Sequence, residues 1–367
     1  MMARRLGWGT CLAVILVSAG WFVSPLRAAA DPPQPTQPAH APNSLCLICH
    51  GQDGLTSRGE DGRERTVHAV EAKAFVDSAH GRLACVNCHP AHSIKPPSDP
   101  RSSVHPLKVA DTCGRCHGDP KYMEAYKIPT DQLAKYRQSV HWRLMSVKGD
   151  LSAPTCNDCH GNHGAAPPGI SWVGNVCGQC HTVQAEFFGK SPHAKVFAQM
   201  GVPGCATCHS NHEIKEATDA MLGLADQAVC AGCHAAGDKG GKAAADMRAL
   251  IDSLGGEYDK ARAILLQAER AGMEVSQAQF DLNGAKDALV KARAAVHAFA
   301  VAAVKKETEP GLTISAKAYA RGVRALEELQ FRRKGLAVSL VIILAVIAEI
   351  VVKIRQLHRR EHRTPSP

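Results

Sequence analysis

The chain has 367 residues, with 15 cysteines and 19 histidines, and its 43 Lys and Arg outnumber its 34 Asp and Glu to give a formal charge of +9. Fourteen cysteines belong to seven copies of the pattern C-x-x-C-H, and the fifteenth is Cys11 near the N-terminus. This distribution excludes a disulfide framework, because no pair of cysteines remains outside the repeated pattern.

The N-terminus has the features of a secretory signal. Two arginines precede an apolar run over residues 6–23, and three alanines at 28–30 follow, where a signal peptidase would cut. We therefore predict a signal peptide over residues 1–30 and a mature chain that begins near Asp31. An uncleaved N-terminal anchor is the alternative, because the apolar run is long. In both cases the rest of the chain is exported, which argues against nucleic-acid binding in spite of the positive charge.

Residues 31–45 are rich in proline and predict an extended linker. The region 46–240 follows and contains all seven C-x-x-C-H motifs. This pattern is the attachment signature of c-type haem, in which two thiols bond to the porphyrin and the histidine binds the iron from one side. Chance would give only roughly a few hundredths of one such motif in a chain of this composition. We therefore predict a heptahaem cytochrome c domain with seven covalently bound haem c groups.

Half of a zinc site is the alternative for any single motif, since two cysteines and a histidine are common zinc ligands. Zinc sites pair their half-motifs, however, and an odd number of motifs argues against this. The thiols predicted to bind haem are those of Cys46, Cys49, Cys85, Cys88, Cys113, Cys116, Cys156, Cys159, Cys177, Cys180, Cys205, Cys208, Cys230 and Cys233. The predicted proximal iron ligands are His50, His89, His117, His160, His181, His209 and His234.

The motif region has about 27 residues for each predicted haem, too few for a conventional apolar core around each cofactor. We expect the haems themselves to form the core, with short helices and many turns around them. Each motif should be a single helical turn. Each haem would also bring about two propionates, so we expect the loaded protein to be acidic.

The motif region repeats itself. An S-x-H triplet, a C-x-x-C-H-x-x-H segment and a second C-x-x-C-H motif occur in this order three times, after an opening piece made of Cys46–His50 and Thr66-Val67-His68. Each repeat therefore has two motif histidines and two further ones, which is the number that six-coordinate haems with two axial histidines would need. The predicted distal ligands are His80, His92, His141, His163, His193 and His212, with His68 as the seventh and His105 and His297 as reserves.

Three of these histidines lie only three residues after a motif histidine: His92, His163 and His212. They are too close along the chain to reach round the same porphyrin, so we expect them to bind a neighbouring haem. A solvated surface histidine is the alternative at each position. Methionine ligands would raise the potential, but Met123, Met145 and Met200 have no repeating position.

The composition changes after residue 240, and residues 241–334 predict a helical hairpin and stalk. Small and apolar residues recur in steps of four and three from Ala278 to Ala303, which is one face of a helix, and a break is expected near Gly272. A third helix is expected over roughly Ser315–Lys334, after Pro310-Gly311. The hairpin is either a packing stalk, or it lies against the last haems with His297 capping one of them.

Residues 335–352 form an apolar run that would be about 27 Å long as a helix, which is enough to cross a membrane. A basic tail follows over 353–367 and predicts a cytoplasmic C-terminus, although Arg332, Arg333 and Lys334 on the other side weaken this signal. The predicted fold is thus mainly α-helical with much irregular structure. It comprises a haem-cored region, a long helical hairpin and a C-terminal transmembrane helix.

The chain resembles the exported bacterial multihaem c-type cytochromes. The resemblance is carried by Ser139-Val140-His141, by the segment 153–163 and by the segment 191–212, and it covers residues 46–240. It implies electron carriers with two histidines on each haem, often tethered to a membrane and paired with quinol-oxidising subunits or terminal reductases. Two departures limit it: the clear anchor here is C-terminal, and no motif ends in the lysine that is typical of the pentahaem nitrite reductases.

The leading functional hypothesis is a membrane-tethered periplasmic cytochrome that passes electrons between a quinol-oxidising membrane partner and periplasmic cytochromes or a reductase. On this hypothesis the chain is not itself an enzyme. The second hypothesis is an oxidoreductase that acts on a small nitrogen or sulfur species at one five-coordinate haem. A third is a direct quinol site where the third helix meets the first or last haem.

Overall fold

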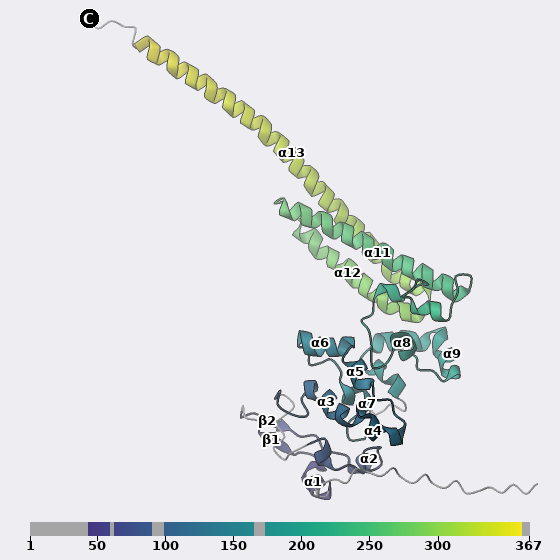
Figure 1. The fold of residues 1–367 in the computed structure, drawn as a ribbon. Coiled ribbons are helices and arrows are strands. Elements are labelled where there is room, and N and C mark those ends of the chain that lie inside the picture. Colours follow the sequence, from purple (N-terminus) through teal and green to yellow (C-terminus); the bar gives the residue numbers. More distant parts are fainter. Residues whose placement is uncertain (1–42, 59–61, 90–98, 165–172, 362–367) are drawn as a thin grey trace, which may run out of the picture. The chain divides into compact units, whose positions relative to one another are not determined.

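A computed structural model describes residues 43–58, 62–89, 99–164 and 173–361, and this part of the chain is mainly helical (Figure 1). The predicted signal peptide and residues 31–42 of the predicted linker lie outside the described residues. The N-terminal elements are α1 (Asn43–His50), β1 (Thr56–Arg58), β2 (Glu64–Thr66), α2 (Ala72–Val76), η1 (Cys85–Asn87), α3 (Pro106–His117), α4 (Pro120–Met123), η2 (Glu124–Tyr126), α5 (Gln132–Tyr136), α6 (Val140–Lys148) and α7 (Cys156–His160). They are followed by η3 (Val173–Gln179), α8 (Thr182–Lys190), α9 (Pro192–Met200), α10 (Ala206–His209), η4 (Asp219–Met221), η5 (Val229–Gly232), α11 (Lys239–Arg270), α12 (Ser276–Ala295), η6 (Val296–Ala298) and α13 (Val301–Glu361).

Each C-x-x-C-H motif overlaps a helical segment, although the third motif forms the last turn of the twelve-residue helix α3 and not the isolated turn that was predicted. Four motifs lie on the α-helices α1, α3, α7 and α10, and three lie on the 3₁₀ segments η1, η3 and η5. The turn is closed by a backbone hydrogen bond from the motif histidine to the first cysteine, for example from His89 to Cys85 and from His234 to Cys230, both at 2.9 Å. One turn brings the two thiols and the imidazole of a motif close together.

The motif region has little apolar core of its own. In the part that the structure describes, Met145 is the one large apolar side chain before residue 239 that is less than 2% exposed. A two-stranded antiparallel hairpin, in which Thr56 pairs with Thr66, was not predicted. Its two strands are only three residues long and largely polar, so they lack the alternating pattern that predicts a strand.

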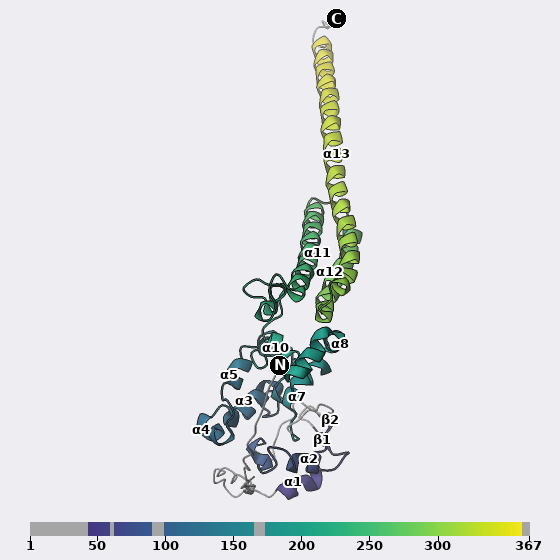
Figure 2. The ribbon, with the colours of Figure 1, turned by 90° about the vertical axis from the view of Figure 1, so that its right-hand side faces the viewer.

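The C-terminal part is a three-helix bundle of α11, α12 and the first half of α13, which lie side by side in Figures 1 and 2. One apolar cluster is built around Leu265 and Leu282, and a second around Leu254 and Val304. The predicted break is confirmed, since α11 ends at Arg270 and Gly272 has a left-handed φ of 80°.

Two predicted boundaries in this bundle are wrong. The apolar face of α12 is buried as expected from Ala278 to Ala292, but the helix ends at Ala295, and Phe299 has a left-handed φ of 50°. The predicted third helix and the predicted transmembrane helix are one helix, α13, which continues through Pro310. Proline in a helix loses one backbone hydrogen bond. Gly311 beside it packs closely on α11 and α12, where an added Cβ would lie 2.8 Å from Leu254 and from Ala288, so tertiary packing supports the helix at this point.

Beyond the bundle, α13 continues without contacts to other helices (Figures 1 and 2). Its apolar side chains there are exposed, from Leu336 at 70% to Leu357 at 53%. Among the described residues, α13 is the one helix long and apolar enough to cross a membrane, with a mean hydropathy of 2.8 in its most apolar window. A continuous exposed apolar helix of this length is unfavourable in water.

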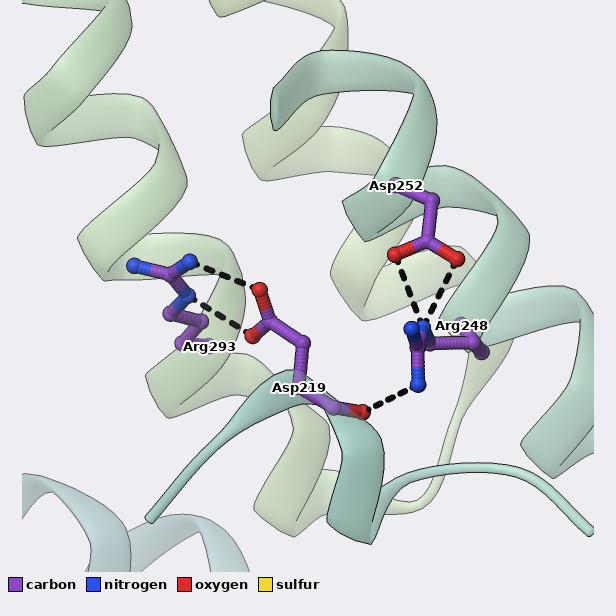
Figure 3. Close-up of polar contacts among 4 residues, drawn as sticks. All are labelled: Asp219, Arg248, Asp252 and Arg293. Carbon is purple, nitrogen blue, oxygen red and sulfur yellow. Dashed lines mark hydrogen bonds and ion pairs between the residues drawn. The ribbon is translucent and has the colours of Figure 1, made fainter. Parts of the chain in front are cut away.

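A polar network fastens the segment between the sixth and seventh motifs to the bundle (Figure 3). The carboxylate of Asp219 in η4 accepts two hydrogen bonds from Arg293 in α12, at 2.8 and 2.7 Å. Arg248 in α11 donates to the Asp219 backbone carbonyl and to Asp252, at 2.7 Å. The last two motifs are thereby held against the helices that lead to the candidate membrane span.

Candidate haem-binding sites

Six of the seven motif histidines lie beside a second histidine that comes from another part of the chain. The imidazole centroids of these pairs are separated by 5.9 to 6.4 Å. The pairs are His117 with His80, His89 with His163, His181 with His141, His160 with His212, His234 with His193, and His209 with His297.

This separation suits two axial ligands of one metal ion. Metal–nitrogen bonds to histidine are about 2 Å long, so two ligating nitrogens on opposite sides of a metal are about 4 Å apart. The distance from each nitrogen to its ring centre extends the centroid separation to about 6 Å. Among the described residues, no group of three or more His, Cys, Asp or Glu side chains could hold a metal ion without further ligands. The imidazole pairs, with two motif thiols beside each, fit the predicted haem groups.

The pairs follow one rule along the repeats. Each S-x-H histidine faces the second motif histidine of its own repeat, as His141 faces His181. In the second and third repeats, the last histidine of the C-x-x-C-H-x-x-H segment faces the first motif histidine of the preceding repeat: His163 faces His89, and His212 faces His160. Neither of these two lies beside the histidine of its own motif, which is the arrangement expected from their short spacing.

The serine of the S-x-H triplet starts the turn that directs its histidine. Ser139 is 1% exposed, caps the N-terminus of α6 and accepts a hydrogen bond from the Trp142 backbone N–H at 3.1 Å. Ser191 is likewise buried at the start of α9, and the Ser78 hydroxyl accepts from the His80 backbone N–H at 3.2 Å. The triplet therefore begins a turn and places the histidine two residues into it.

In the second and third repeats, the residue directly after the first histidine of the C-x-x-C-H-x-x-H segment has a left-handed φ. Gly161 has a φ of 72° after His160, and Ser210 has a φ of 65° after His209. The next residue is Asn162 or Asn211, and its side-chain oxygen accepts from the following histidine's N–H, at 2.7 and 2.6 Å. This turn directs His163 and His212 away from their own motifs. The first repeat has Pro90 and Ala91 at these positions, so the sequence signature does not extend to His92.

Burial keeps most of these imidazoles neutral. Desolvation lowers the pKa of four motif histidines and of four of their partners. They are His89, His117, His160, His209, His141, His163, His193 and His212. The neutral imidazole is the form that binds a metal ion, so the environment favours the ligating state.

The motif thiols place the seven attachment sites in a series that follows the sequence. The first cysteines of neighbouring motifs lie close enough for their thiols to interact: Cys46 with Cys85, Cys113 with Cys156, and Cys177 with Cys205. At the remaining steps the thiols are near enough to influence each other electrostatically: Cys88 with Cys116, Cys159 with Cys177, and Cys208 with Cys230. Each motif therefore adjoins the next one along the chain.

The turn between α12 and α13 reaches the last two sites. His297, in η6, lies beside His209 with its ring nearly parallel, and its Nδ1 is 3.0 Å from the Ala294 carbonyl oxygen. Such a hydrogen bond makes Nδ1 the protonated nitrogen and leaves Nε2 free to bind a metal. The Phe299 ring centroid is 3.9 Å from that of His193. The bundle thus contacts both sites and is not only a stalk.

The other candidate ligands are not paired with a motif histidine in the described part of the chain. His105 is 3% exposed, and its Nδ1 accepts a hydrogen bond from the Leu107 N–H at the start of α3, so it serves as a helix cap. His50 and His68 are exposed, although the Val70 N–H donates to the His50 carbonyl at 2.7 Å. His92 lies outside the described residues.

Comparison with known proteins supports part of this interpretation. Residues 176–257 match the protein family described as cytochrome c554 and c-prime. The match covers less than a quarter of the chain and contains the last three C-x-x-C-H motifs, with His193 and His212. No curated protein and no solved structure matches the chain. The similarity to this family supports a c-type cytochrome with covalently bound haem that transfers electrons.

Proposed function

We propose that the chain is a membrane-tethered periplasmic cytochrome with seven haem c groups, which passes electrons between a quinol-oxidising membrane partner and periplasmic cytochromes or a terminal reductase. The observation that carries this proposal is the set of six imidazole pairs at 5.9 to 6.4 Å. The two imidazoles of a pair would both hold the iron of a haem bound between them, and no position on that iron would then remain for a substrate. Haem sites with two histidine ligands exchange electrons with other redox groups and do not bind a substrate at the iron.

When bound, haem supplies one-electron transfer, and the residues of the chain hold, space and tune the haem groups. The series of neighbouring motifs from Cys46–His50 to Cys230–His234 supports a single path that follows the sequence. His297 and Phe299 support a connection at its C-terminal end, since the turn that carries them leads directly into α13. Electrons would therefore pass between the membrane side and the sixth or seventh haem, in either direction.

The proposed cellular location follows from the N-terminal and C-terminal segments of the chain. The predicted signal peptide places the motif region outside the cytoplasm, and residues 335–352 within α13 would span the membrane. The basic residues that follow, from Lys353 onward, would then lie in the cytoplasm. This topology keeps the haem region where c-type haem is attached in bacteria.

The second ligand of the first haem, opposite His50, decides between an electron-transfer protein and an enzyme. The repeat rule extrapolates to His92, because this histidine has the same position relative to His89 as His163 has to His160. His68 is the other candidate, since it lies two residues before Val70, which bonds to the His50 carbonyl. If neither binds, the exposed first haem would be five-coordinate, and this site could reduce or oxidise a small nitrogen or sulfur species.

The full-length protein, purified with its haems in detergent, tests the proposal. We expect seven haems per chain by haem absorbance against protein mass, a low-spin ferric EPR spectrum, and no carbon monoxide binding after reduction. One carbon monoxide per chain would favour the enzyme. Fewer than seven haems would overturn the heptahaem assignment.

A further inference from the structure

A carboxylate lies next to the motif histidine of the seventh site. Asp238 is the N-cap of α11, and its side chain accepts hydrogen bonds from the backbone N–H groups of Gly241 at 2.6 Å and Ala235 at 2.7 Å. One of its oxygens, Oδ1, is also 3.3 Å from His234 Nδ1. A single side chain thus caps the helix and contacts the imidazole that is predicted to bind the seventh haem iron.

The other sites differ at this nitrogen. Among the described residues, His234 is the one paired motif histidine with a carboxylate at Nδ1. His89 Nδ1 is buried without a hydrogen-bond partner among those residues, and His297 Nδ1 is held by a backbone carbonyl. The contact therefore distinguishes the seventh site from the others rather than repeating along the chain.

The start of α11 keeps this contact in place. An added Cβ at Gly240 would lie 2.2 Å from both Cε1 and Nδ1 of His234, so the first turn of the helix rests directly against the ring. The two backbone hydrogen bonds from Gly241 and Ala235 hold the Asp238 carboxylate in its position beside the ring. The first turn of α11 therefore crowds one edge of the imidazole.

We propose that Asp238 lowers the reduction potential of the seventh haem relative to the other six. A carboxylate that accepts the Nδ1 proton makes the imidazole a stronger electron donor, and a stronger donor stabilises the ferric iron more than the ferrous iron. Asp238 acts through His234 and is a positioning residue. The inference requires a haem at Cys230–His234 but holds whether the protein is a conduit or an enzyme.

The consequence would be a lower potential for the haem at the end of the series that adjoins the bundle than its two imidazole ligands alone would give.

The test compares two matched variants of the full-length, haem-loaded protein. In Asp238→Asn, asparagine remains a good N-cap but the charge is lost. Asp119→Asn is the control, because Asp119 also caps a helix just after a motif histidine, accepting from the Lys121 and Tyr122 N–H groups, and makes no ion pair with His117 in the part of the chain that the structure describes. Each variant is titrated with a chemical reductant while absorbance and EPR spectra are recorded.

We expect one of the seven components in Asp238→Asn to be about tenfold easier to reduce at a given potential, a rise of about 59 mV for one electron. The component should be the haem between His193 and His234, whose ring planes are 80° apart, since the angle between the imidazole planes controls the anisotropy of the low-spin EPR signal. In the control Asp119→Asn, the reduction potential of every component should shift by less than that of the affected component in Asp238→Asn.

An equal shift in both variants would overturn the inference, because it would show a general charge effect. A second variant, Gly240→Ala, should change the EPR signal of the same component by moving the His234 ring. An unchanged signal would contradict the packing described here. Haem counting and mass spectrometry of the Cys230–His234 peptide keep the two proposals apart: a peptide without haem refutes the heptahaem assignment, whereas seven haems with unshifted potentials refute only the role of Asp238.

Discussion

Replacing His297 by alanine removes an imidazole whose ring centroid lies 6.1 Å from that of His209. Phe299 and the packing of the bundle remain, so the turn between α12 and α13 should keep its position. The pairing predicts that one haem of seven loses its second axial ligand. The expected changes are therefore a high-spin signal of about one seventh of the total haem and one carbon monoxide bound per chain after reduction.

The assay is a carbon monoxide titration followed by absorbance, with a low-temperature EPR spectrum of the oxidised protein. His105→Asn is the matched control, because asparagine can replace the helix cap that His105 supplies and no haem ligand should be lost. A His297→Ala protein that stays fully low-spin and binds no carbon monoxide would refute the reasoning. If only the His105 variant binds carbon monoxide, the ligand is His105 instead.

Three further predictions test the remaining features. His92→Ala should open one haem to carbon monoxide and His68→Ala should not, if the repeat rule extends to His50; the reverse result would assign His68. Leu254→Ala should lower the free energy of unfolding by about 2–5 kcal/mol, because Leu254 is fully buried in the bundle, whereas the same change at exposed Phe331 should have little effect in a denaturant titration of the detergent-solubilised protein. Removal of residues 335–367 should release a haem-loaded protein from the membrane fraction, while removal of 362–367 alone should not; retention of the longer truncation would show that another segment anchors the chain.

The bundle gives the last haem sites a mechanical link to the candidate membrane span. Asp219 and Arg293 join the segment before the seventh motif to α12, and His297 and Phe299 extend from the turn that starts α13. Exposed ion pairs contribute only about 0–1 kcal/mol each, so the attachment depends more on the ring contacts and on Phe187 and Leu222, which pack against the apolar cluster of the bundle. If the bundle packs against the last two motifs and also supplies His297 as a haem ligand, it would hold the sixth and seventh haems at a constant distance from α13.

The local features were predictable from the sequence by itself. Seven attachment motifs, helical structure at each of them, an apolar face on α12 and a long apolar C-terminal helix all depend on residues that are near one another in the chain. The repeat also indicated that His163 and His212 would serve a neighbouring motif, because three residues cannot span a porphyrin.

Only the tertiary structure decided which distant groups meet. The separation of 88 residues between His209 and His297 carries no pattern, and neither does the contact of Asp238 with His234, in which a helix cap and an imidazole share one carboxylate. The sequence also did not predict that α13 continues through Pro310. The helix loses a backbone hydrogen bond there, and the close packing of the adjacent Gly311 against Leu254 and Ala288 supports it. Short-range spacing determined where haem can attach, and long-range packing determined which imidazoles face each other across the space for it.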